Sequence, residues 1–213
     1  MKNKKYLYLS LCAFASFWVW TALLCFVDVK PVGAEGTDLG FSTVNLFFHG
    51  LTGVNMFLYR LTDVLSLIPL GFVCGFALTG LCQWIKRKSL LKADADLLML
   101  GGFYIAVAAV YIVFEIAAVN YRPLLIDGRL EASYPSSTTV LTACVMPAAA
   151  IQLKRRIKRK TLRKWTAAGI YAFTVFMIAA RFISGVHWAT DIAGGILISV
   201  SLVCAYKFCV NLA

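Results

Sequence analysis

The sequence predicts an all-α, polytopic membrane protein with six transmembrane helices and with both termini in the cytoplasm. Three observations support this fold class: 61% of the 213 residues are hydrophobic, only 15% are charged, and the charges cluster between long apolar runs. Soluble domains average about 45–50% apolar and about 25% charged residues. The net charge of +11 does not indicate a nucleic-acid partner, because the basic residues form no continuous face.

Six apolar runs are long enough to be considered as membrane spans. A helix needs about 20 apolar residues to cross the hydrocarbon core. The fourth run is the shortest and must begin near Ser136 to span comfortably. Each run is apolar on all sides, which is typical of a helix embedded in lipid. The runs are roughly Tyr6–Val29, Val64–Ile85, Leu97–Val119, Thr139–Leu153, Trp165–Ile183 and Ile192–Val210.

The basic residues predict the orientation of the chain. Sixteen of the 21 lysines and arginines lie at the amino terminus, after the second span, in residues 154–165 and at Lys207. The positive-inside rule therefore assigns these segments to the cytoplasm. Both termini then lie inside, which requires an even number of spans. Residues 154–165 form a basic cytoplasmic loop, and residues 30–63 form an extracytoplasmic segment.

Two parts of the amino-terminal third allow alternatives. The first span could be a cleaved signal peptide, because the small residues Val32-Gly33-Ala34 follow it, but its apolar run exceeds the usual 7–15 residue core. We therefore expect it to be retained. Residues 41–59 are aromatic-rich, which predicts one or two short helices at the membrane interface. This segment either covers the bundle or acts as a lid that guides a lipid headgroup.

Five polar residues gather at the outer level of the spans, namely Glu115, Arg122, Arg181, His187 and Asp191. Ionisable residues at membrane depth are costly, so they are candidates for function. A carboxylate that accepts one imidazole N–H leaves the other nitrogen as a nucleophile or base. Arginine forks suit phosphate. The alternative is a structural His–Asp pair with two interfacial arginines.

The arrangement of these residues resembles a known family. Arg181-x5-His187-x3-Asp191 is similar to the third signature of the type-2 phosphatidic acid phosphatase and vanadium haloperoxidase superfamily. Arg122-Pro123 resembles the end of its first signature. Pro135-Ser136-Ser137-Thr138 falls where the second signature, Pro-Ser-Gly-His, is expected. The order, the spacing and the six-span layout resemble the membrane phosphatase branch.

The resemblance implies a single transmembrane phosphatase-like domain over residues 1–213. Its expected activity is hydrolysis of a lipid phosphate or diphosphate at the extracytoplasmic face of the cell membrane, through a phosphohistidine on His187 oriented by Asp191. The expected partners are the bilayer and a lipid resembling phosphatidic acid or a polyprenyl diphosphate, with no nucleic acid, metal or other cofactor. The phosphate would be held by Arg122, Arg181, Ser136, Ser137, Thr138 and Gly185.

The chain departs from the family pattern at functional positions. Glu115 stands where a lysine is expected, and Thr138 stands where the general-acid histidine is expected. Losing a general acid typically costs 10²–10⁴ in rate. Glu115 either replaces this acid or pairs with an arginine. A further possibility is that the substrate is a diphosphate, whose better leaving group needs less protonation. The alternative functions are a catalytically impaired member that binds or transports phosphorylated lipids, and a phosphotransferase.

Overall fold

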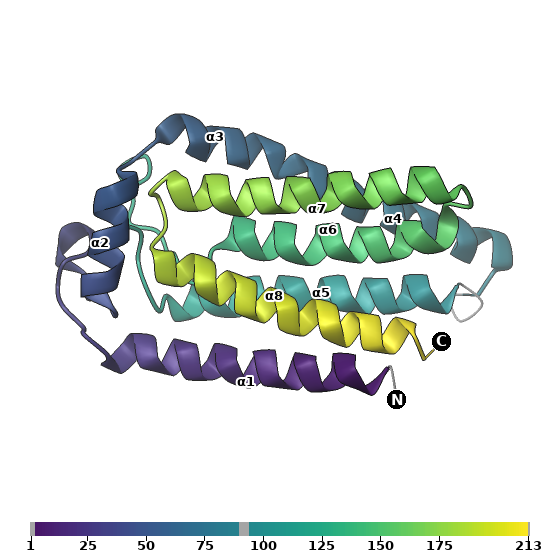
Figure 1. Cartoon of the computed structure of the whole chain (residues 1–213), viewed down its shortest axis with the longest axis horizontal. Helices are drawn as coiled ribbons and strands as arrows, with labels where there is room; N and C mark the ends of the chain where they lie inside the picture. Colours follow the sequence, from purple (N-terminus) through teal and green to yellow (C-terminus); the bar gives the residue numbers. More distant parts are fainter. Residues whose placement is uncertain (1–2, 90–93, 213) are drawn as a thin grey trace.

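The computed structural model describes residues 3–89 and 94–212. Lys2 and Lys92, which were counted with the cytoplasmic basic residues, lie outside these ranges. The long helices run side by side in a bundle, and α2 lies across one end of it (Figure 1). The α-helices are α1 (Lys4–Phe26), α2 (Ser42–Thr52), α3 (Met56–Leu65), α4 (Leu67–Arg87), α5 (Ala95–Ala117), α6 (Ser137–Arg156), α7 (Lys160–Ile183) and α8 (Ala189–Val210), with a short 3-10 turn at Ala34–Gly36.

Within the described residues, five stretches of helix are long and apolar enough to cross a membrane: α1, the continuous stretch Met56–Arg87, α5, α7 and α8. These helices confirm the prediction of an all-helical, multi-pass membrane protein. They correspond to five of the six predicted spans. The sixth span and the orientation of the termini stay predictions.

Helix α6, which contains the fourth predicted span, is not among these five apolar stretches. Its 20 residues give a length of about 30 Å, but polar side chains interrupt it, and Thr139, Thr142 and Gln152 are fully buried. The helix packs against α4, α5, α7 and α8. The prediction that every run is apolar on all sides is therefore wrong for α6, because protein surrounds it.

Helix α1 is an integral wall of the bundle. Phe17 and Leu24 are buried in the main core, and α1 lies along α8. The hydroxyl of Ser201 in α8 donates to the Ser10 carbonyl at 3.0 Å. This packing gives α1 a structural role that a cleaved leader would not have.

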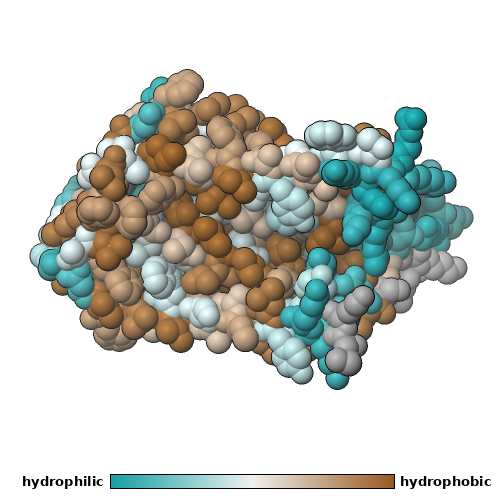
Figure 2. Space-filling view, viewed as in Figure 1, coloured by the Kyte–Doolittle hydropathy of each residue, from teal (hydrophilic) through white to brown (hydrophobic). Residues whose placement is uncertain are grey.

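The two termini lie at the same end of the bundle (Figure 1), as an even number of spans requires. Hydrophilic residues gather at this end, whereas brown apolar surface covers the middle of the molecule (Figure 2). The predicted loop at residues 154–165 is wrong in one respect. Helix α6 continues to Arg156 and α7 begins at Lys160, so most of its basic residues extend the two helices.

The segment between α1 and α4 forms a cap over the opposite end of the bundle. It contains α2 and α3, which confirms the predicted short helices. The Asn45 side chain in α2 is fully buried. It accepts the Thr190 N–H at 3.2 Å and donates to the Thr190 hydroxyl at 3.0 Å. The Asn55 N–H donates to the Ser184 carbonyl at 2.9 Å, so the cap is docked on the turn between α7 and α8.

Candidate active site

His187 lies in the turn that joins α7 to α8. The turn depends on Gly185, whose φ of +66° is left-handed and whose missing Cβ lets the Gly53 carbonyl of the cap approach closely. Helix α8 begins at Ala189, so His187 precedes it. His187 and Asp191 therefore do not lie on one face of the same helix. Asp191 instead caps α8 by accepting the Trp188 N–H at 2.9 Å.

A serine joins the imidazole to Asp191. His187 Nδ1 and Asp191 Oδ2 are 3.8 Å apart, which is too far for a hydrogen bond. The Ser133 hydroxyl lies 2.9 Å from Nδ1 and 2.5 Å from Asp191 Oδ2. Because an ionised carboxylate only accepts, Ser133 donates to Asp191 and accepts from Nδ1–H. Asn120 donates to the other Asp191 oxygen at 3.2 Å.

This arrangement leaves His187 Nε2 as a free lone pair. The atom is buried and has no hydrogen-bond partner among residues 3–89 and 94–212. Burial lowers the pKa of His187 to about 4; Asp191 raises it, and the Arg122 and Arg181 charges lower it. The imidazole is therefore neutral near pH 7, which is the state that a nucleophile requires.

Arg122 approaches the imidazole from the loop after α5. The loop folds back on itself, and the Arg122 N–H donates to the Glu131 carbonyl at 3.1 Å. The Arg122 Nε lies 3.0 Å from Glu131 Oε2 as an ion pair. That ion pair lacks the alignment of a hydrogen bond. Arg122 Nε and Nη1 are buried and have no hydrogen bond in the described structure.

Arg181, in the last turn of α7, is held by the cap. Its Nη1 donates to Asp63 Oδ1 at 2.8 Å and to the Thr62 hydroxyl at 3.0 Å. The Tyr59 ring lies under both guanidinium groups, with its centroid 4.6 Å from Arg181 Cζ and 5.7 Å from Arg122 Cζ. This cation–π contact stabilises two like charges near each other.

Three cap residues and three loop residues were therefore missed by sequence reasoning: Tyr59, Thr62, Asp63, Asn120, Glu131 and Ser133. The aromatic enrichment of residues 41–59 was the available signal for Tyr59. The other five are common polar residues, and nothing in their spacing distinguishes them.

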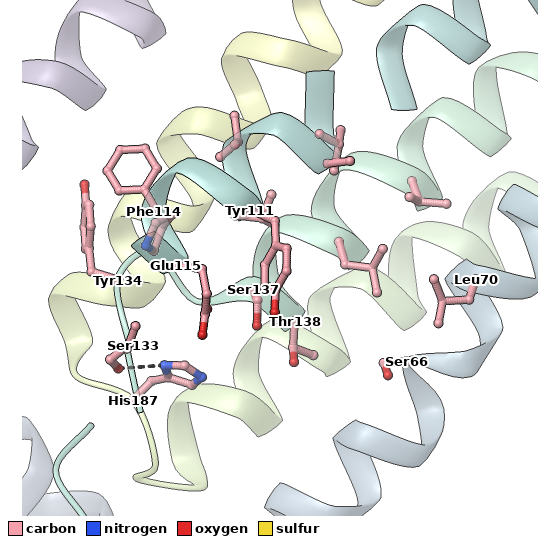
Figure 3. Close-up of a pocket in the computed structure, with 18 of the residues that line it drawn as sticks. Ser66, Leu70, Tyr111, Phe114, Glu115, Ser133, Tyr134, Ser137, Thr138 and His187 are labelled. Carbon is pink, nitrogen blue, oxygen red and sulfur yellow. Dashed lines mark hydrogen bonds between the residues drawn. The ribbon is translucent and has the colours of Figure 1, made fainter. Parts of the chain in front are cut away.

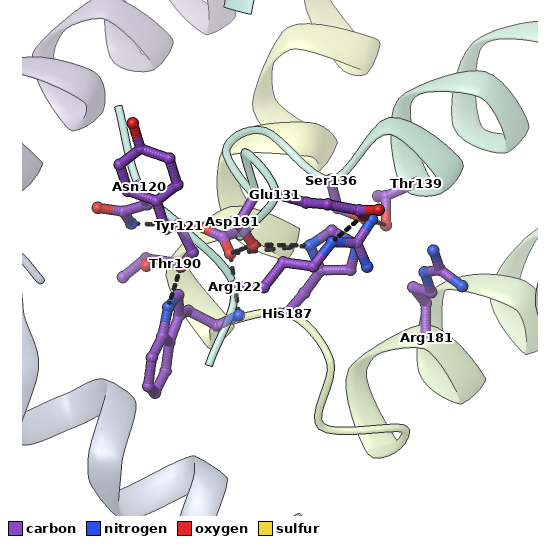
Figure 4. Close-up of polar contacts among 12 residues, drawn as sticks. Asn120, Tyr121, Arg122, Glu131, Ser136, Thr139, Arg181, His187, Thr190 and Asp191 are labelled. Atoms are coloured by element: carbon purple, nitrogen blue, oxygen red, sulfur yellow. Dashed lines mark hydrogen bonds and ion pairs between the residues drawn. The ribbon is translucent and has the colours of Figure 1, made fainter. Parts of the chain in front are cut away.

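Three residues of the candidate site, His187, Arg122 and Arg181, carry buried nitrogens that lack hydrogen bonds among the described residues. Figure 4 shows Arg122 beside His187, with Arg181 facing them from α7. His187 Nε2, Arg122 Nε and Nη1, and Arg181 Nε are buried and lack hydrogen bonds within the described part of the chain. Leaving such groups unsatisfied is costly. A tetrahedral oxyanion would supply acceptors for the guanidinium donors and an electrophile for the lone pair.

The residues of the second-signature region take different positions. The Ser136 N–H donates to the Asp191 carbonyl at 3.2 Å, and the Gly185 N–H donates to the Phe182 carbonyl at 3.2 Å. These two N–H groups are engaged, so Ser136 would contribute to a phosphate site through its hydroxyl. Ser137 and Thr138 begin α6 and line a cavity together with His187.

This cavity has a volume of about 540 Å³ and lies between α4, α5 and α6. Figure 3 shows Ser133, Glu115, Ser137, Thr138 and His187 at one end of it. The remaining lining is mainly apolar. From Glu115 to Tyr104 the cavity follows α5 for eleven residues, a rise of about 16 Å. That length is close to one leaflet of the roughly 30 Å hydrocarbon core.

Glu115 has no ion pair among the described residues. The arginines have other carboxylate partners, since Arg122 pairs with Glu131 and Arg181 pairs with Asp63. The interpretation of Glu115 as the partner of an inward arginine is therefore wrong. Its carboxyl group points into the cavity beside the candidate site (Figure 3).

The carboxyl-terminal part of the chain matches a known protein family. The family model of the PAP2 superfamily matches residues 117–212, the part of the chain that carries both arginines, the Ser136 region and the His187–Asp191 turn. This match confirms the resemblance inferred from the three motifs. No curated protein matches this chain.

The whole fold also has a solved counterpart. The structure is similar to a transmembrane PAP2 type phosphatidylglycerolphosphate phosphatase from Bacillus subtilis, with a TM-score of 0.67 and 17% sequence identity. The similarity covers 94% of each chain. At this identity, the likeness establishes the fold alone.

The site predicts that the protein binds a phosphate-like anion. Orthovanadate should bind to the detergent-solubilised protein, and R181Q should weaken binding by about 10–100-fold, because a hydrogen bond to a charged group contributes about 1.5–3 kcal/mol. Isothermal titration calorimetry measures the affinity. The matched control is R60Q, which removes an exposed arginine of α3 and should leave it unchanged. Equal affinities of R181Q and R60Q would contradict the assignment.

Proposed function

We propose that this protein is an integral membrane phosphatase that hydrolyses a lipid phosphate or diphosphate at the extracytoplasmic face, through a phosphohistidine on His187. One observation carries the proposal: buried nitrogens of His187, Arg122 and Arg181 lack hydrogen bonds within the described residues, and His187 lines the polar end of an apolar cavity. The match to the PAP2 superfamily supports it. The phosphatase named for the similar solved structure adds support.

In the first chemical step, the two guanidinium groups hold the phosphoryl oxygens and stabilise the charge that develops on them. His187 Nε2 attacks phosphorus, and the bond from phosphorus to the leaving oxygen breaks. Ser133 and Asp191 hold the proton on Nδ1 and stabilise the positive charge of the phosphorylated imidazole. Water then attacks phosphorus, the N–P bond breaks, and phosphate is released.

The cavity supports a lipid as the substrate. Its apolar part is bounded by helices that are long and apolar enough to cross a membrane. A lipid of the outer leaflet could place its phosphate beside His187 and its tail along α5. Phosphatidic acid-like lipids and polyprenyl diphosphates both have this form. A diphosphate needs less protonation of its leaving group, which suits a site with Thr138 in place of histidine.

The position of the site supports the extracytoplasmic assignment. The α7–α8 turn lies at the end of the bundle opposite to both termini (Figure 1). The basic residues concentrate at the end with the termini, and the positive-inside rule assigns that end to the cytoplasm. The cell membrane is the proposed location.

Thr138 favours a second candidate function. A site without the usual histidine acid could bind or transport phosphorylated lipids with little turnover. A phosphotransferase, which passes the phosphoryl group to an acceptor other than water, is a further alternative. Product analysis with a labelled lipid diphosphate separates these functions, because only hydrolysis releases inorganic phosphate.

H187A tests the proposed nucleophile. Phosphate release from a lipid phosphate or a polyprenyl diphosphate should fall by at least about 10³-fold, since loss of a covalent nucleophile removes the whole two-step path. The control is H49A, which removes the other histidine of the chain and should retain activity within a few-fold. Equal rates for wild type and H187A would refute hydrolysis through this residue and favour the binding function.

S133A tests the link between the imidazole and Asp191. Losing this hydrogen bond to a charged group should lower kcat by about 10–100-fold, with little change in KM, because Ser133 fixes the imidazole rather than the substrate. S133T keeps the hydroxyl and should recover part of the rate. Steady-state kinetics of both variants measure the effect. A wild-type kcat for S133A would contradict the role of Ser133 in linking Asp191 to the imidazole.

The lowered pKa of His187 predicts an unusual pH dependence. The imidazole must be neutral to attack, and it becomes protonated near pH 4 rather than near 6.5. Above its pKa the reactive form is fully present, so the dependence of kcat/KM on this group should stay flat from pH 7 to about 5 and fall near 4. Samples returned to pH 7 control for unfolding. An imidazole limb centred near 6.5 would contradict the burial argument.

A further inference from the structure

The candidate site lacks a proton donor where the PAP2 family places a histidine. Thr138, the second residue of α6, stands at that position, and a threonine hydroxyl is far too weak an acid to protonate a leaving alkoxide near neutral pH. We propose that Glu115 is the catalytic residue that donates this proton. The inference rests on the proposed phosphatase function and identifies the residue that completes its chemistry.

The first support is that the Glu115 carboxyl group is uncommitted. Three other carboxylates surround the site, and each has a strong partner: Asp63 contacts Arg181, Glu131 contacts Arg122, and Asp191 accepts from Ser133. Glu115 has neither an ion pair nor a hydrogen bond within the described residues. It can therefore exchange a proton without breaking an existing contact.

The second support is its position on α5. The cavity lining includes Tyr104, Val107, Tyr111 and Glu115, which are spaced three or four residues apart and so form one stripe along the helix. Glu115 is the outermost and the only charged member of this stripe. A lipid tail that follows the stripe would bring the oxygen between its tail and its phosphorus to the level of Glu115.

The third support comes from the opposite side of the cavity. His187, Ser137 and Thr138 belong to the α7–α8 turn and to α6, and they line the same cavity as Glu115. In Figure 3 the Glu115 carboxyl group is directed toward the end of the cavity that holds these residues. In-line transfer requires the nucleophile and the leaving oxygen on opposite sides of phosphorus. A donor on α5 and a nucleophile on the turn meet this requirement.

The carboxylates at the site outnumber the arginines. The two arginines are matched by Asp63, Glu131 and Asp191, so these five groups sum to −1. The proposed step takes Glu115 as the carboxylic acid when the phosphoryl group is bound. The other titratable groups that line the cavity are His187, Tyr104, Tyr111 and Tyr134.

Over the two steps Glu115 gives up one proton and takes one back. As His187 Nε2 bonds to phosphorus, the electron pair of the breaking P–O bond goes to the leaving oxygen. That oxygen takes the proton from Glu115, which becomes a carboxylate. In the second step, the carboxylate takes a proton from water while the water oxygen attacks phosphorus. The N–P bond electrons return to Nε2, and Glu115 is again an acid.

The test compares two leaving groups in the full-length protein. A long-chain alkyl phosphate expels an alkoxide that needs a proton, whereas p-nitrophenyl phosphate expels a stable phenolate. E115Q should lose about 10²–10⁴-fold in kcat/KM on the alkyl phosphate and at most a few-fold on p-nitrophenyl phosphate. Adding T138H to E115Q should restore part of the alkyl phosphate activity.

The matched control is E35Q, which makes the same change at an exposed glutamate that does not line the cavity and should leave both activities unchanged. Equal losses of E115Q on both substrates, or no loss on either, would overturn the assignment of Glu115. Failure of the proposed function has a different signature, because H187A would then retain the wild-type rate on both substrates.

Discussion

The central constraint on this structure is the burial of an imidazole and two guanidinium groups, four of whose nitrogens have no hydrogen bond within residues 3–89 and 94–212. An unsatisfied buried polar atom costs about 1–3 kcal/mol, and more when it is charged. The fold tolerates this cost because Asp63, Glu131 and the Tyr59 ring partly compensate the arginines. An oxyanion would satisfy the remaining donors. The buried donors that lack hydrogen bonds within the described residues are therefore the same groups that would bind the anion.

The scaffold reaches this arrangement by giving single residues several roles. Asp191 caps α8 through the Trp188 N–H, orients the imidazole through Ser133 and anchors the Asn120 loop. The start of the last helix and the tautomer of the nucleophile thus depend on one carboxylate. In the same way, the cap is both a cover over the bundle end and the support of Arg181. A change in any of these contacts would alter the fold and the site together.

The burial of α6 explains why its sequence looks unlike the other spans. A helix surrounded by α4, α5, α7 and α8 does not face lipid, so hydroxyl and amide side chains can find protein partners. Gln152, for example, donates to Tyr206 and to the Asp96 carbonyl. The same freedom allows Ser137 and Thr138 at its outer end, where they line the candidate active site instead of the membrane.

The sequence alone identified the site residues whose types are rare at membrane depth. His187, Asp191, Arg122 and Arg181 stand out because charged and ionisable groups are costly there, and the structure brings all four together. Ser133 could not be found in this way, since a serine in a polar loop carries no signal. Its role appears only when the distance between His187 and Asp191 is known.

The cap shows a second limit of sequence reasoning. Its helices were predictable from aromatic and polar patterning, but their docking depends on contacts between residues more than a hundred positions apart, such as Asn45 with Thr190 and Thr62 with Arg181. A single sequence gives no information on such pairs. The alternative in which Glu115 pairs with an arginine failed for the same reason, because Asp63 and Glu131 pair with the two arginines.

The most direct test of this account is rapid-quench labelling with a lipid substrate that carries ³²P in its terminal phosphate. The account predicts an acid-labile, alkali-stable phosphoryl label that maps to His187, forms faster than phosphate is released, and is lost in H187A. Steady release of phosphate without any protein-bound label, or a label on another residue, would contradict the central role of the buried imidazole.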